Sequence, residues 1–148
     1  MTSILNKKAR FNYTLQESFE AGLVLSGAEV KAVKLNRVSL NESYAKIVRG
    51  ELWLINAHIS PYQPKNQPNY QPTRPRKILI KKSELNSLYG KLKEKRLTLV
   101  PSKLFLTRGL VKIELALAKS KKKYDKRESI KKEEQERETR RKIRLRVK

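Results

Sequence analysis

The chain has 148 residues, about the length of one domain, and 36 Lys and Arg against 14 Asp and Glu give it a formal charge of +22. A compact protein with so much charge repels itself, and a polyanionic partner is the usual reason to carry it. With no cysteine, no apolar signal core and no apolar run of about 18 residues, the sequence argues against disulfides, thiol chemistry and a membrane anchor. It favours nucleic acid as the partner and the cytoplasm as the default location.

The first predicted elements are a basic segment and a strand. Residues 6–10 carry three positive charges and one side-chain amide. After them, Phe11, Tyr13 and Leu15 alternate with polar residues, and this period of two predicts a half-buried strand. A short helix is then predicted over residues 28–35, where apolar side chains recur at helical spacing.

Most of the remaining body is predicted to form strands. They comprise a hairpin over residues 43–48 and 51–59, a short strand over 77–80, and a hairpin over 97–107 and 110–118. A helix is predicted after Ser83, which would be its N-cap, because Leu85, Leu88 and Leu92 follow at helical spacing. About six short antiparallel strands with two or three short flanking helices favour a small closed barrel, because closure removes exposed strand edges.

A proline-rich loop separates two of these strands. Residues 60–76 hold five of the six prolines, so this segment is predicted to be neither helix nor strand. Its last part, residues 73–77, places three positive charges close to Tyr62 and Tyr70. Positive charges beside aromatic rings are typical of phosphate contact combined with base stacking.

The last thirty residues differ from the rest. Residues 119–148 hold 15 of the basic and 6 of the acidic residues, a net charge of +9, which leaves +13 for residues 1–118. From 119 to 142 only Tyr124 and Ile130 are sizeable apolar or aromatic side chains, too few to offset the entropy of ordering the segment. Several acids precede a base by four residues, which supports a marginal helix. We therefore predict a body over 1–118 and a tail over 119–148, disordered when free, that either stays a solvated tail or folds on an anionic partner.

The residues needed for catalysis are missing. His58 is the only histidine and lies in a strand-like stretch, the body's eight glutamates are spread singly, and the glycines form no phosphate-binding loop. The sequence therefore predicts no enzyme activity, no metal site and no cofactor.

Glu20 is an acid in an otherwise apolar, strand-like stretch, and three interpretations of it stay open. It is an ordinary surface residue, or it accepts hydrogen bonds from amino or 2′-hydroxyl groups of RNA, or it holds a neighbouring Arg or Lys in place.

Seven short motifs occur together in an order that resembles the SmpB family, from about Asn6 to the end of the chain. They are Asn6-Lys-Lys-Ala-Arg10, Phe19-Glu-Ala-Gly-Leu23, Gly27-Ala-Glu-Val-Lys31, Ser43-Tyr-Ala45, Pro72-Thr-Arg-Pro-Arg-Lys77, Leu88-Tyr-Gly90 and Lys121-Lys-Lys-Tyr-Asp-Lys-Arg127. The resemblance implies a barrel of the OB-fold type. It also implies an adaptor that binds the transfer-RNA-like domain of transfer-messenger RNA (tmRNA, the SsrA RNA) and delivers it to stalled ribosomes in trans-translation.

The same resemblance implies residue roles. The RNA-binding face would comprise Asn6, Lys7, Lys8, Arg10, Glu20, Lys31, Arg74, Arg76 and Lys77. The tail would occupy the empty messenger channel near the decoding centre of the small subunit through Lys121, Lys122, Lys123, Tyr124, Asp125, Lys126, Arg127, Ile130, Lys131 and Lys132. The implied partners are tmRNA and the ribosome and, indirectly, alanyl-tRNA synthetase and elongation factor Tu, with the protein acting as a monomer.

Two residues depart from the family pattern. Ser120 stands where members often have Gly, which predicts a stiffer junction, and Tyr124 stands where many have His, so that a role for an imidazolium charge would be lost. Two other interpretations of the whole chain remain. Composition alone is equally typical of a structural ribosomal or general RNA-binding protein, and an RNA-processing enzyme is disfavoured by the missing acid–base residues.

Overall fold

The computed structural model describes residues 3–121. Its helices are α1 (Lys7–Asn12), α2 (Gly27–Lys34) and α3 (Lys82–Lys95), with one 3-10 turn at Pro64–Asn66. Its strands are β1 (Ser3–Leu5), β2 (Tyr13–Leu23), β3 (Val38–Ser39), β4 (Tyr44–Val48), β5 (Glu51–Ile55), β6 (His58–Ile59), β7 (Arg76–Leu79), β8 (Thr98–Thr107) and β9 (Leu110–Ser120).

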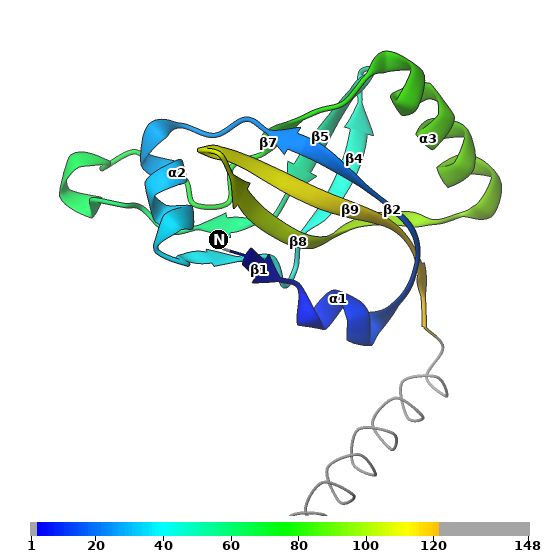
Figure 1. Cartoon of the computed structure of the whole chain (residues 1–148), viewed down its shortest axis with the longest axis horizontal. Coiled ribbons are helices and arrows are strands. Elements are labelled where there is room, and N and C mark those ends of the chain that lie inside the picture. Colours follow the sequence, from blue (N-terminus) through cyan, green and yellow to red (C-terminus); the bar gives the residue numbers. More distant parts are fainter. Residues whose placement is uncertain (1–2, 122–148) are drawn as a thin grey trace, which may run out of the picture.

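Six strands form a closed antiparallel ring in the order β8-β4-β5-β7-β2-β9, and β9 pairs back onto β8 (Figure 1). The short strand β1 adds to β8, and β3 and β6 form a separate two-stranded sheet. The three helices lie around the ring, with α2 and α3 at well-separated positions on it. The structure confirms the predicted closed antiparallel barrel with about six strands and short flanking helices.

The barrel interior is filled by alternating strand residues. In β9, Val111, Ile113, Leu115 and Leu117 are all buried, as the period-two pattern predicts. They pack with residues of every other ring strand and with Leu85 of α3. Burying one such side chain contributes roughly 1.5–3 kcal/mol, so this shared core is the main source of stability.

The first predicted strand exists, but its predicted start at Phe11 is wrong. Phe11 belongs to helix α1, and strand β2 begins only at Tyr13. The helix forms because Asn6 caps it, its side-chain oxygen accepting a hydrogen bond from the Ala9 N–H at 3.1 Å. Alternation over so few residues did not distinguish a short capped helix from a strand.

Other boundaries also shift. Helix α3 begins at Lys82 after an N-cap at Lys81, so Ser83 lies inside its first turn and is not the predicted cap. Asn56 adopts a left-handed backbone conformation (φ 62°) that ends β5 and moves His58 into the separate strand β6. Strand β9 continues past Ala118 to Ser120, pairing with the start of β2. Within residues 3–121, no helix is long and apolar enough to cross a membrane.

Candidate nucleic-acid interface

Helix α1 places three cations on the surface at one end of the barrel. Lys7, Lys8 and Arg10 are exposed, and Lys8 forms an ion pair with the exposed Glu42. The end of β9 lies beside this helix, since the Lys121 N–H donates to the Asn12 carbonyl at 2.9 Å. The structure therefore brings together the predicted N-terminal RNA residues and the first predicted tail residue.

Asn6, predicted as an RNA contact, is instead fully buried. Its Nδ2 donates to the Leu40 carbonyl at 3.0 Å and to the Pro101 carbonyl at 2.8 Å, while its Oδ1 caps α1. All of its hydrogen-bonding atoms are thus occupied by the protein. Asn6 positions the basic helix and does not itself reach the surface, which corrects the prediction.

A second group of predicted residues surrounds the buried carboxylate of Glu29, in helix α2. Arg76 at the start of β7 donates from Nε (2.8 Å) and Nη2 (2.6 Å) to its Oε2, and Arg74 donates to Oε1. The Tyr70 hydroxyl lies 3.0 Å from the same carboxylate and 2.8 Å from the Ile59 carbonyl. These bonds fasten the end of the proline-rich loop to α2.

This network sets the charge state of Glu29. Burial would raise the pKa of the carboxyl, but hydrogen bonds from Arg74, from the Ser26 N–H and from Arg76 outweigh it and lower the pKa to about 2. Burial also raises the pKa of Tyr70. Glu29 is therefore ionised at neutral pH, where its carboxylate binds two arginines.

Arg76 is the second predicted RNA contact that is buried instead of exposed. Its side chain is 0% exposed, with its remaining donors bound to the Ala57 and Pro72 carbonyls. A guanidinium that is completely buried and bound within the protein presents no N–H group to a phosphate at the surface. Arg74 differs, because its side chain is 37% exposed.

Two further predicted cations lie on the surface near this network. Lys31 of α2 is exposed, and its Nζ lies 5.4 Å from the centre of the Tyr62 ring in the proline-rich loop. Lys77 of β7 is 45% exposed, with the Glu51 carboxylate 3.7 Å away. Both remain available to a phosphate group.

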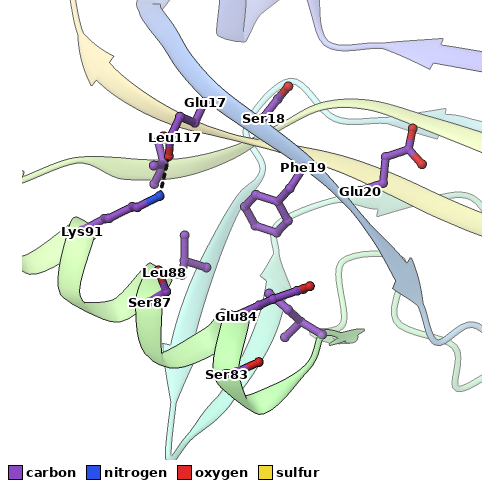
Figure 2. A pocket seen from close by; sticks show the side chains of 11 residues that line it. Glu17, Ser18, Phe19, Glu20, Ser83, Glu84, Ser87, Leu88, Lys91 and Leu117 are labelled. Atoms are coloured by element: carbon purple, nitrogen blue, oxygen red, sulfur yellow. Dashed lines mark hydrogen bonds and ion pairs between the residues drawn. The ribbon is translucent and has the colours of Figure 1, made fainter.

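Glu20 lies apart from these cations, in a groove of about 650 Å³ between β2 and α3 (Figure 2). Phe19 points into the groove, and Glu17 at its rim accepts a hydrogen bond from Lys91 that lowers the pKa of Glu17. Among residues 3–121, no Lys or Arg forms an ion pair with Glu20. The described structure thus gives no support to the idea that Glu20 holds a neighbouring cation.

Of the predicted tail residues only Lys121 is described, and Lys122, Lys123, Tyr124, Asp125, Lys126, Arg127, Ile130, Lys131 and Lys132 lie outside the described residues. His58 is exposed in β6. The part of the chain that the structure describes holds no cluster of three metal-ligating side chains.

Sequence reasoning missed Glu29 as the organiser of this region. A signal was present, because Ser26 and Glu29 form a capping box at the start of α2: the Ser26 N–H donates to Glu29 at 3.0 Å, and the Glu29 N–H donates to Ser26. The pattern marks the helix start. It does not reveal that the same carboxylate binds two arginines more than forty residues away.

Comparison with known proteins agrees with this architecture. The family model described as "SmpB protein" matches residues 3–145. An SsrA-binding protein of Geobacillus thermodenitrificans is 50% identical over 97% of this chain and 92% of its own length, and one of Desulforudis audaxviator is 52% identical over 90% and 87%. A solved structure described as "tmRNA-SmpB: a journey to the center of the bacterial ribosome" matches with a TM-score of 0.70 and 39% identity, over 88% of this chain and 95% of that one. The chain belongs to the SmpB family.

Proposed function

We propose that this protein is an RNA-binding adaptor that binds tmRNA and delivers it to stalled ribosomes in trans-translation. The observation that carries the proposal is the near full-length identity of about 50% to proteins described as SsrA-binding. The exposed cations of α1, α2 and β7 give the barrel the chemistry to hold an RNA backbone, because phosphate contacts supply most of the affinity in such complexes.

Two regions of the chain divide this work. The body, predicted as residues 1–118, would hold the transfer-RNA-like part of tmRNA through Lys7, Lys8, Arg10, Lys31 and Lys77. Arg74, which is only partly exposed because it also binds Glu29, would contribute less. Asn6 and Arg76 would not contact the RNA themselves. Asn6 would position α1, and Arg76 would position the proline-rich loop. The tail, predicted as residues 119–148, would enter the empty messenger channel near the decoding centre and become helical there.

The protein would act as a monomer without catalysis of its own, in the cytoplasm where ribosomes stall. Its effects on alanyl-tRNA synthetase and elongation factor Tu would be indirect, since both act on the RNA that it carries.

Sequencing the RNA that copurifies with the full-length protein at moderate salt tests the proposal. We expect one structured RNA, tmRNA, in about equimolar amount. Recovery of ribosomal RNA in proportion to all ribosomes, without tmRNA, would show a structural ribosomal protein instead.

A further inference from the structure

A row of three side chains crosses the outer face of the barrel. Lys46 of β4 is directly opposite Trp53 of β5, and Trp53 is directly opposite Lys77 of β7. Directly paired residues of neighbouring antiparallel strands point to the same side of a sheet. The three side chains therefore share one face, with the aromatic ring between two cations.

This face is the outer one. The residues that flank Trp53 along its strand, Leu52 and Leu54, are 1% and 0% exposed in the barrel core. Trp53 points the other way and is half-buried, while both lysines are exposed. Trp53 is the only tryptophan of the chain, and nothing in the residues next to it in the sequence indicates that it lies between two lysines.

The row combines the two contacts that unpaired RNA needs. Strands lie about 4.8 Å apart, so the two lysine backbones are about 10 Å apart and their side chains reach either side of the ring. An aromatic ring stacks on any nucleobase, and flanking cations bind the phosphates next to that base.

The surroundings of the row also suit RNA. Lys46 lines a shallow hollow of about 420 Å³ beside the exposed Tyr89, and Lys77 lines another of about 300 Å³. The acid beside Lys77 is Glu51, and that pair is exposed and 3.7 Å long, so solvent weakens it. On a chain of charge +22, a polyanion complements such a surface better than another protein of ordinary composition does.

We propose that Trp53 is a base-stacking residue for an unpaired nucleotide of the bound RNA, with Lys46 and Lys77 holding the adjacent phosphates. The inference rests on the proposed function and adds to it a specific subsite and the class of nucleotide that occupies it.

Because Trp53 is the only tryptophan, its fluorescence reports directly on this face. Full-length protein is titrated with transcribed tmRNA while binding is measured independently by gel shift. We expect tryptophan emission to be quenched in parallel with complex formation. Trp53→Ala should weaken binding about 5- to 100-fold, as the loss of one stacked base does, and Trp53→Phe should retain most of the affinity.

A charge-matched pair of variants tests the lysines. Lys46→Gln/Lys77→Gln should weaken binding and lower the slope of log affinity against log salt by about 2, since each phosphate contact contributes about 1. The control, Lys95→Gln/Arg96→Gln, removes two exposed cations at the end of α3, which has no part in the proposed RNA surface, and should leave the quenching of Trp53 unchanged. Circular dichroism confirms that each variant is folded.

The possible outcomes are distinct. If tmRNA binds with unchanged emission and Trp53→Ala binds like the wild type, the subsite is wrong while the proposed function stands. If emission changes with protein concentration in the absence of RNA, the face is an interface between copies of the chain and the inference is also wrong. If the wild type does not bind tmRNA at all, the proposed function itself fails.

Discussion

The Arg76 guanidinium and the Glu29 carboxylate form a completely buried ion pair, with both side chains 0% exposed and 2.6 Å between Nη2 and Oε2. Burying two charges costs several kcal/mol for each ion, which only good geometry and further hydrogen bonds repay. Here Arg74, Tyr70 and three backbone groups provide those bonds, and the described structure holds no buried side-chain polar atom without a partner. The pair therefore joins α2 to β7 and to the proline-rich loop.

Removing one member of this pair should be severely destabilising. We expect Glu29→Gln to lower the free energy of unfolding by about 3–5 kcal/mol, because it leaves the Arg76 charge buried without an anion. Chemical denaturation measures the change. Glu94→Gln removes an exposed carboxylate from α3 and should cost less than about 0.5 kcal/mol. A Glu29→Met/Arg76→Met variant should lose less than the two single changes combined, because the paired charges disappear together.

Glu29 also predicts a dependence of stability on acid. Its pKa falls from an ordinary 4.5 to about 2 in the folded protein, so the unfolded state binds the proton more readily. The stabilisation is complete above about pH 4.5 and is lost as the pH falls toward 2. The difference in unfolding free energy between wild type and Glu29→Gln should accordingly be constant near neutral pH and shrink over that acidic window. A difference that stays constant down to pH 2 would contradict the depressed pKa.

Asn6 should contribute to the stability of the folded protein and not to RNA binding by direct contact. Asn6→Ala removes the cap of α1 and leaves the Leu40 and Pro101 carbonyls without their donor, so we expect a loss of roughly 2–4 kcal/mol. Thermal and chemical unfolding measure it, with the exposed Asn41→Ala as control. Asn6→Asp keeps the cap but loses the amide donors, so it separates the two contributions. An Asn6→Ala protein of wild-type stability with impaired RNA binding would return Asn6 to the list of direct contacts.

Binding of tmRNA should depend steeply on salt. If about 6–10 phosphates are contacted, affinity should fall roughly 10³- to 10⁵-fold between about 50 and 200 mM salt. Filter binding or fluorescence at several salt concentrations measures the slope. Lys7→Gln/Lys8→Gln should lower that slope by about 2, because both side chains lie on the exposed face of α1. A flat response would argue against an electrostatic interface.

Most of the predicted tail, residues 122–148, can be removed without cutting into the barrel. Lys119 and Ser120 pair with Thr14 and Tyr13, so a truncation after Lys121 leaves β9 whole. We expect protein lacking residues 122–148 to bind tmRNA with nearly wild-type affinity while losing tagging activity on stalled ribosomes. Tagging by the truncated protein at the wild-type rate would refute the proposed division between body and tail.

Patterns that repeat along one strand were predictable. The alternation of Val111, Ile113, Leu115 and Leu117 predicted β9 and its buried face, and β9 pairs with β8 as the predicted hairpin requires. Enough such strands made a closed barrel the natural prediction. The alternation does not indicate where an element begins or ends. The start of α1 depends on one capping bond to Asn6, and the end of β5 depends on the left-handed backbone conformation of Asn56.

The candidate site was predictable in part for a related reason. Charge is visible in a sequence, whereas the burial of a charge is not. Lys7, Lys31 and Lys77 are on the surface as expected, but Arg76 is in the interior because Glu29, distant in the sequence, binds it there. Trp53 was overlooked because its significance depends on strand register, which brings Lys46 and Lys77 to either side of it.

The bond between the Lys121 N–H and the Asn12 carbonyl has a mechanical consequence. It sets the point from which the last 27 residues extend, in the same rigid frame as the basic helix α1. When the protein binds RNA through α1, the position of Lys121 relative to that RNA is therefore fixed by the barrel. Inserting residues just after Lys121 would lengthen this tether without touching either binding surface. How quickly rescue declines with each added residue would then measure the distance that the tail has to span.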